Sequence, residues 1–269
     1  MGLSVIKAHA YGNDFLFVDI TELHIASDAR PALTRRLCHR HEGIGADGVI
    51  FYGLRTRGAT MSLFNADGSA SELSGNGLRC LGALVARAQR LERGAEVVVD
   101  TGAGPKTLEL LGREGERYTF RAALGAPEDI RQTSIEVAGE ALTASILRLG
   151  NPQCIVLGPL PDASRFARIG SALATHEMFP AGTNVEFAEV ETRDRVRILI
   201  WERGVGPTTS SGTGASASAV AAAAHGGAAR DVQVVAPGGA QRVEWRRDGV
   251  YLTGWAEIVF NGEWLSDAR

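Results

Sequence analysis

Cysteine is scarce in this chain of 269 residues, and no stretch of it resembles a membrane span. The three cysteines, Cys38, Cys80 and Cys154, are too few and odd in number for a disulfide scaffold, which favours a reducing cytoplasm. The most apolar stretch, ASASAVAAAA, is too short and too small-sided to cross a bilayer. Because the first residues lack a basic segment followed by an apolar run, we expect no secretory signal.

Neither positive nor negative charge is in large excess. The net charge is −3, which gives no electrostatic reason to expect binding to nucleic acid or to an acidic membrane surface. Apolar residues make up 45% and charged residues 22% of the chain, the composition of a globular protein. The length allows one large or two ordinary domains, each with a real core.

Two short phrases recur along the chain. SGNG begins at Ser74 and SGTG at Ser211, and Gly-Asn pairs stand at Gly12 and Gly150. The members of each pair are separated by nearly the same distance. Each Ser-Gly-x-Gly motif also follows a β-rich segment and a polar loop, and precedes an alanine-rich run. Four aligned features in one order predict a duplicated domain.

Strand signals outnumber helix signals. Short β-branched or aromatic runs closed by Gly, Asp or Pro, such as VIFYGL, EVVVDTG, NVEFAEVE and RVRILIW, predict strands. Helices are predicted near residues 29–41, 75–90, 163–174 and 212–225.

A helix among many strands, twice over, predicts an α+β fold of two pseudo-symmetric halves, each a curved sheet wrapped around a central helix. We expect an N-terminal half at residues 1–130 and a C-terminal half at residues 131–269, whose final strands could pack back on the first half. The active site would lie in a cleft between them, where small-molecule sites tend to form.

The two repeated motifs lie where helices should begin. A helix N-terminus carries free N–H groups and partial positive charge, and so attracts carboxylates. Ser74 and Ser211 could reach one small anion from opposite sides. Amides and a Glu-Arg pair suit a ligand that carries both ammonium and carboxylate groups. The candidates lie in or beside glycine- or proline-rich loops and are Asn13, Asn65, Asn76, Asn151, Asn184, Glu202 and Arg203. Taken singly, each is better explained as a helix cap or turn former; the paired set favours a site.

Other motifs fail their structural context. GIGADG, residues 43–48, leads from a helix-like segment into a strand, the reverse of a dinucleotide fingerprint. TGAGPKT lacks the order of a phosphate-binding loop. Cys38, His39 and His41 have no fourth ligand at a usual spacing, so we expect no metal.

Several longer phrases resemble the diaminopimelate epimerase family. They include KAHAYGNDF, HEGIGADGVIF, FNADGSASELSGNGLRC, LGNPQC, FPAGTNVEF, WERGVGPTTSSGTGASA and LTGWAEIVFNGEW, and they run from Lys7 to Trp264 in family order. The resemblance implies an isomerase that converts L,L- to meso-diaminopimelate in lysine biosynthesis. The resemblance also implies that this enzyme needs no cofactor, acts on a small amino dicarboxylate and forms a homodimer.

The resemblance also implies which residues line the substrate site. They are Asn13, Asn65, Gly75, Asn76, Asn151, Asn184, Glu202, Arg203, Gly212 and Thr213. In the family, a cysteine on each face of the substrate Cα removes or returns the proton. Here Ser74 and Ser211 occupy those catalytic positions, Gln153 replaces a histidine, and Pro207 replaces a glutamate.

Serine changes the acid–base chemistry. A hydroxyl with a pKa near that of water, about 15.7, is roughly 7 units weaker as an acid than a thiol at about 8.5, so its anion costs about 10 kcal/mol more. A helix N-terminus supplies at most about 2 kcal/mol. A helper base is therefore needed, and His176, His9 and Glu202 are the candidates. Three interpretations stay open: an epimerase with such a base, an isomerase or dehydratase of another small carboxylate, and a non-catalytic amino-acid binder.

Overall fold

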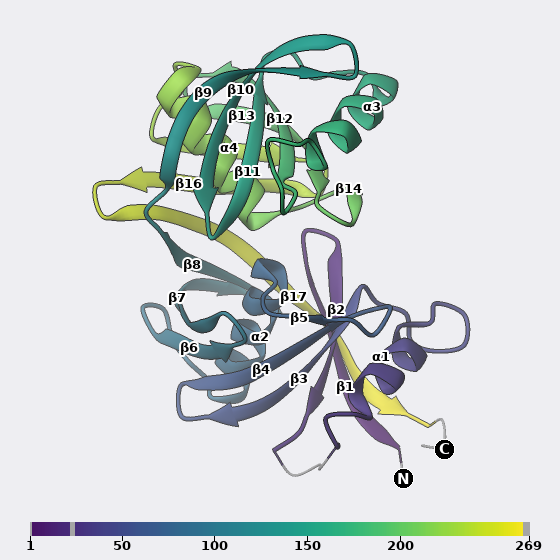
Figure 1. Cartoon of the computed structure of the whole chain (residues 1–269). Helices are drawn as coiled ribbons and strands as arrows, with labels where there is room; N and C mark the ends of the chain where they lie inside the picture. Colours follow the sequence, from purple (N-terminus) through teal and green to yellow (C-terminus); the bar gives the residue numbers. More distant parts are fainter. Residues whose placement is uncertain (1, 22–24, 266–269) are drawn as a thin grey trace. The chain divides into compact units, whose positions relative to one another are not determined.

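The computed structural model describes residues 2–21 and 25–265 (Figure 1). The chain forms two compact units, Met1–Ala122 with Gly254–Arg269, and Ala123–Thr253. The sequence analysis placed the division at residue 130, whereas the units divide inside a strand that ends at Gly125. The reason lies in the packing of that strand. Its residues up to Ala122 pair with the preceding strand of the first unit, and Leu124 packs on the core of the second.

The first unit contains ten elements in chain order. They are β1 (Leu3–Ala10), β2 (Asn13–Asp19), α1 (Arg30–Cys38), β3 (Gly48–Arg55), β4 (Gly58–Asn65), β5 (Ala70–Ser71), α2 (Gly75–Ala88), β6 (Glu96–Thr101), β7 (Gly104–Glu114) and β8 (Arg117–Gly125). The end of β8 belongs to the second unit.

The second unit continues with β9 (Glu128–Val137) and ten further elements. They are β10 (Glu140–Leu149), β11 (Asn151–Leu157), α3 (Ala163–Ala174), β12 (Asn184–Thr192), β13 (Arg195–Glu202), β14 (Gly206–Thr208), α4 (Gly212–His225), β15 (Asp231–Ala236), β16 (Gly239–Arg246) and β17 (Gly249–Trp264). The last part of β17 counts with the first unit, because its residues 257–264 pair with β1.

The two units repeat one another element by element. The order from β1 to β8 recurs from β10 to β17, with α1 matched by α3 and α2 by α4. Parallel pairs fall at the same places, β2–β3 and β4–β6 in the first unit, β11–β12 and β13–β15 in the second. The expected α+β fold of two pseudo-symmetric halves is confirmed, and so are all four predicted helices, the first of them shorter than expected.

A central helix organises each unit, as Figure 1 shows for α2 and α4. Helix α2 contacts β1, β2, β4, β6 and β7, and α4 contacts six strands of the second unit. Nine consecutive residues of α4, from Gly214 to Ala222, are buried, so the helix is enclosed on all sides. Alanine and serine side chains let the strands approach this helix closely.

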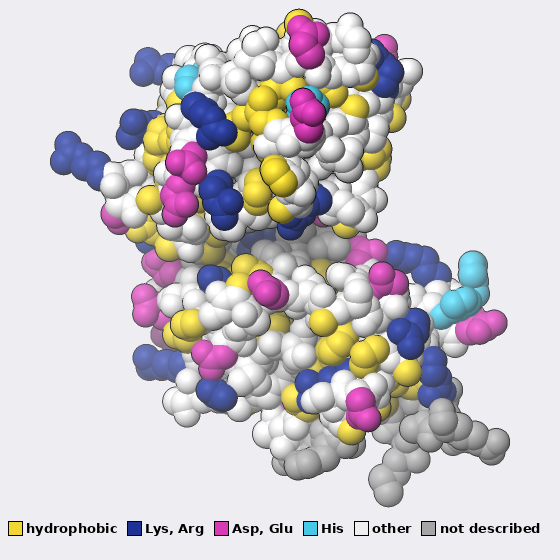
Figure 2. All heavy atoms as spheres, in the orientation of Figure 1, with side chains coloured by type: hydrophobic (Ala, Val, Ile, Leu, Met, Phe, Trp, Pro, Cys, Tyr) yellow, Lys and Arg dark blue, Asp and Glu magenta, His cyan; other side chains and the backbone are white. Residues whose placement is uncertain are grey.

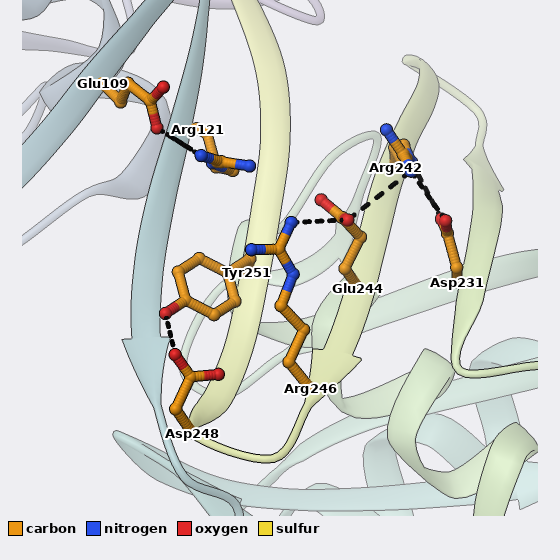
Figure 3. Close-up of polar contacts among 8 residues, drawn as sticks. All are labelled: Glu109, Arg121, Asp231, Arg242, Glu244, Arg246, Asp248 and Tyr251. Carbon is orange, nitrogen blue, oxygen red and sulfur yellow. Dashed lines mark hydrogen bonds and ion pairs between the residues drawn. The ribbon is translucent and has the colours of Figure 1, made fainter. Parts of the chain in front are cut away.

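Charged side chains of both signs lie on the face of the molecule that Figure 2 draws. On the face drawn in Figure 2, Lys and Arg side chains of the described residues are interspersed with Asp and Glu. On β15 and β16, Asp231 and Glu244 stand at directly paired positions, where like charges repel. Arg242 contacts both, at 2.6 and 3.5 Å (Figure 3). Within the described residues, no helix is long and apolar enough to cross a membrane.

Enlarging an enclosed position on α4 tests this packing. Ala221 is fully buried, so Ala221→Leu should lower the free energy of unfolding by about 1–3 kcal/mol through overpacking. Ala224 lies on the same helix and is exposed, so Ala224→Leu should change it by less than about 0.5 kcal/mol. Urea unfolding followed by circular dichroism measures both. Equal effects of the two substitutions would contradict the enclosed position of α4.

Candidate active site

Ser74 caps helix α2 in the first unit. Its backbone is extended, and its Oγ accepts a hydrogen bond from the N–H of Gly77 at 3.1 Å. The N–H groups of Gly75 and Asn76 precede that bond and have no acceptor among the described residues. Free N–H groups at a helix start bind anions. A methyl group added at Gly77 would lie 2.8 Å from Ile50 Cδ1, so a larger residue here would require the Ile50 side chain to shift.

A tight hairpin turn brings Asn13 to this helix start. Tyr11 and Gly12 join β1 to β2 with φ angles of 56° and 86°, the type I′ pattern that suits two-residue hairpins. Tyr11 is a bulky residue in a left-handed conformation, which is uncommon. Its buried ring packs against Trp255, with centroids 4.5 Å apart. Asn13 is thereby fixed as the first residue of β2.

A polar chain that runs from the exposed Asp47 to the buried Arg79 links Asn13 to α2. Asn76 Nδ2 donates to Asn13 Oδ1 at 3.2 Å, and Asn13 Nδ2 donates to Asp47 Oδ2 at 2.9 Å. Arg79 donates to Asn76 Oδ1 at 2.5 Å and lies over the Tyr11 ring. Arg79 is only 2% exposed, and its burial lowers the pKa of its guanidinium. We call the residues around the start of α2 the first half-site and those around the start of α4 the second half-site. The first half-site therefore contains a buried cation, Arg79.

Asn65 lies near this chain but does not join it. Its Nδ2 donates to Ser69 Oγ at 2.9 Å, and its side chain is exposed. The following residue, Ala66, donates its N–H to the Asp47 carbonyl at 3.0 Å. The turn after β4 is thus held beside the loop that carries Asp47.

Ser211 caps helix α4 in the second unit in the same way. Its Oγ accepts from the N–H of Gly214 at 3.2 Å, and the N–H groups of Gly212 and Thr213 have no acceptor among the described residues. The Ser211 Oγ lies 3.5 Å from Thr213 Oγ1, and the Ser211 hydroxyl is close enough to the Glu202 carboxyl to favour its ionised form. Burial raises the pKa of the Glu202 carboxyl, and the Ser211 hydroxyl opposes the rise.

Asn184 holds the strand end that carries the Glu-Arg pair. It begins β12, is buried, and accepts the Arg203 N–H on Oδ1 at 2.9 Å. The Arg203 guanidinium donates to the Ala181 carbonyl at 2.7 Å and is otherwise exposed. Asn184 thus fixes the backbone next to Glu202, and the Arg203 side chain has no carboxylate partner in the described chain.

Asn151 is connected to a buried glutamate that the sequence analysis did not select. One end of the Gln153 carboxamide lies 2.6 Å from Asn151 Oδ1, and the other end lies 3.1 and 3.2 Å from the two Glu186 carboxyl oxygens. Glu186 is fully buried, which raises the pKa of its carboxyl well above the ordinary value, and nearby Glu202 adds to the rise.

The other proposed helper bases lie elsewhere in their units. The His176 ring contacts the Glu136 carbonyl and the Met178 N–H. The His9 ring accepts the Gly12 N–H at 3.3 Å. Of the three candidates, Glu202 alone has a recorded contact with either serine.

Four residues of these half-sites escaped the sequence analysis. They are Tyr11, Asp47, Arg79 and Glu186. Arg79 and Glu186 had a usable signal, because each is a charged residue inside an apolar run, LRCLGALV and NVEFA. Lys, Glu, Arg and Asp are almost never fully buried unless paired. No group of His, Cys, Asp and Glu able to hold a metal occurs among the described residues.

Comparison with known proteins gives one family. The family model described as diaminopimelate epimerase matches residues 5–127 and 145–259. The chain is 41% identical to the diaminopimelate epimerase of Desulforudis audaxviator, over 96% of this chain and 98% of that protein. It is 36% identical to the chloroplastic enzyme of Oryza sativa subsp. japonica, over 97% of this chain and 79% of that protein.

A solved structure shows the same fold. A predicted epimerase from Pseudomonas aeruginosa superimposes with a TM-score of 0.74 at 16% identity, over 98% of this chain and 100% of that chain. At this identity the likeness concerns the fold alone.

The three cysteines should take no part in the chemistry. All are buried, and burial raises the pKa of each thiol to about 12. Since the thiolate is the reactive form, iodoacetamide should leave the native protein unlabelled at pH 8 and label all three thiols in urea. Mass spectrometry counts the modified sites. Rapid labelling of Cys80 or Cys154 in the native protein would contradict their burial.

Proposed function

The chain belongs to the diaminopimelate epimerase family, and from this we propose that it interconverts L,L- and meso-diaminopimelate without a cofactor. The observation that carries the proposal is the repeated Ser-Gly-x-Gly start of the central helix in each unit. Ser74 and Ser211 each stand beside free N–H groups. We propose that the two half-sites act on one substrate Cα from opposite faces.

The substrate charges match the groups that the half-sites offer. The N–H groups at Gly75 and Asn76, or at Gly212 and Thr213, suit the carboxylate next to the reacting carbon. They also suit the negative charge that develops on it when the Cα proton leaves. Amide side chains suit the ammonium and carboxylate groups of the distal end, because an amide both donates and accepts. The exposed Arg203 guanidinium suits a carboxylate.

The serines must act as proton relays. A free alkoxide would cost about 10 kcal/mol more than a thiolate. Neither hydroxyl can therefore wait as an anion. A hydroxyl that receives the Cα proton must lose its own proton to a partner at the same time.

Glu202 is the proton acceptor on the face of Ser211. The Ser211 hydroxyl takes the Cα proton while its own proton passes to the neighbouring Glu202 carboxylate, which Ser211 already influences in the free protein. Burial raises the pKa of this carboxyl, which makes Glu202 a stronger base than an exposed glutamate.

Ser74 is the proton donor on the other face. Its hydroxyl gives a proton to Cα and takes one from a water molecule, because no titratable side chain contacts Ser74 within the described residues. The hydroxide formed is neutralised by the proton that Glu202 returns to solvent. In the reverse reaction hydroxide removes the Ser74 proton as the hydroxyl takes the Cα proton. The hydrogen that arrives at Cα through Ser74 therefore comes from solvent.

We also propose a cytoplasmic homodimer as the working form. Three free cysteines, all buried, suit a reducing compartment. The family resemblance supports the dimer.

Exchange of the Cα proton tests the function. In D₂O with L,L- or meso-diaminopimelate, proton NMR should show loss of the Cα–H signal together with formation of the other stereoisomer. Ser74→Ala and Ser211→Ala should each reduce the rate at least about 100-fold, as removal of a general acid or base does, with little change in binding. Replacing both serines by cysteine should increase the rate, because a thiol forms its anion far more easily.

A matched control is Ser216→Ala on α4. The Ser216 hydroxyl is buried and has no partner in the described chain, so its removal should leave the rate unchanged. No exchange in the wild type, with binding of diaminopimelate still seen by calorimetry, would contradict the proposed activity. It would favour a binder, or an isomerase or dehydratase of another carboxylate.

The rate should depend on pH through Glu202. The carboxyl must be ionised to accept a proton, so the rate should rise with pH through a pKa above the ordinary value for glutamate, about 4.3, and then level. Glu202→Gln cannot accept the proton, and its residual rate should not show this rise. The measurement is the initial exchange rate from pH 4 to pH 9. The same rising profile in Glu202→Gln would assign the titration to another group.

A further inference from the structure

Glu186 is a buried acid without an assigned role. It lies in the apolar run of β12, is fully buried, and stands opposite Ile200 of β13. A methyl group added at Gly214 would be 2.5 Å from Glu186 Oε1. The carboxyl therefore fills the space against the first turn of α4, where Ser211 caps the helix.

Among the residues that the structure describes, no cationic side chain offsets the charge of this carboxyl. The titratable groups that face it are Glu202 on β13 and Cys154 on β11, and from α4 it meets the backbone of Gly214. Burying an unpaired carboxylate is unfavourable by several kcal/mol, so a group in such a place becomes neutral. The raised pKa of Glu186 agrees with this reasoning.

The neighbouring amides distinguish the charged from the neutral form. If Glu186 were ionised, Gln153 would turn its nitrogen toward Glu186 and its oxygen toward Asn151 Oδ1, 2.6 Å away. Two acceptors would then face each other unless Asn151 also turned. If Glu186 is protonated, its O–H donates to the Gln153 oxygen, and Gln153 Nε2 donates to Asn151 Oδ1. Both ends of the Gln153 carboxamide are then hydrogen-bonded without further change.

The protonated form also determines what Asn151 can offer. With its oxygen engaged by Gln153, Asn151 can present only its Nδ2 group outward. An amide nitrogen is a donor with two hydrogens, which selects a carboxylate or another acceptor on the ligand.

We propose that Glu186 is a neutral carboxylic acid that, through Gln153, holds Asn151 with its nitrogen toward a carboxylate of the substrate. Glu186 is thus a positioning residue, separated from the ligand by the Gln153 and Asn151 side chains. The assignment of Asn151 to the substrate rests on the function proposed above. The state of Glu186 and its link to Gln153 do not.

Two substitutions separate this role from simple packing. Glu186→Gln keeps the shape and a donor for the Gln153 oxygen, so its Kd for meso-diaminopimelate should stay within about twofold of the wild type. Glu186→Leu removes the donor and frees both amides to turn, which should weaken binding about tenfold, the effect of one hydrogen bond. Isothermal calorimetry measures binding, with Ser74→Ala and Ser211→Ala present in every protein compared so that the ligand is not turned over. Equal weakening by the two variants would overturn the positioning role.

Infrared spectroscopy tests the protonation state directly and needs no substrate. The difference spectrum between the wild type and Glu186→Gln at pH 7 should contain the carbonyl stretch of a protonated carboxyl group. Carboxylate bands in its place would overturn the inference even in an active epimerase. Failure of the wild type to exchange the Cα proton would refute the proposed function, while a protonated-carboxyl band would still support the neutral state of Glu186.

Discussion

A serine that caps a helix accepts a backbone N–H on its oxygen and keeps its own hydrogen free to donate. This geometry occurs at Ser74 and Ser211, where the accepted N–H groups come from Gly77 and Gly214. The same hydroxyls lie next to unpaired N–H groups. A ligand carboxylate held there would be within reach of a hydrogen-bond donor whose own proton must move for any chemistry to occur. The groups that can receive or replace that proton therefore decide what each half-site can do.

The two half-sites differ in charge although their folds repeat. The first contains the buried guanidinium of Arg79, held by Asn76 and the Tyr11 ring. The second contains two acids, Glu186 and Glu202, whose pKa values burial raises. A buried cation favours negative charge nearby, and acids with raised pKa values favour taking up a proton. The duplicated fold thus places a buried cation, which favours a nearby anion, in the first half-site, and acids that favour taking up a proton in the second.

The helices and their starting residues could be predicted from short stretches of the sequence. The starts of α2 and α4 follow from the two Ser-Gly-x-Gly motifs, and the four helices follow from the pattern of apolar residues, because capping and periodicity are local signals. Strands β1, β9 and β10 were not singled out. The place of β1 depends on pairing with β17, a partner distant along the chain, whereas β9 and β10 pair with each other. Packing also decides where the chain divides, since the end of β8 belongs to a different unit from its beginning.

Contacts of single side chains were out of reach for the same reason. Nothing in the sequence pairs Glu202 with Ser211, or Gln153 with Glu186, since each pair joins separate strands or a strand and a helix. Once the contacts are known, three departures from the family pattern become coherent. Serine cannot use the acid–base range of a thiol, so in the proposed mechanism Ser211 passes its proton to Glu202, a carboxyl with a raised pKa. A non-titrating Gln153, where the family has histidine, then serves as a fixed link between Asn151 and Glu186. Pro207, exposed in β14, has no structural explanation. The changes at residues 74, 153 and 211 thus fit one shift, from exchange through thiols to a relay through hydroxyls and buried carboxyls.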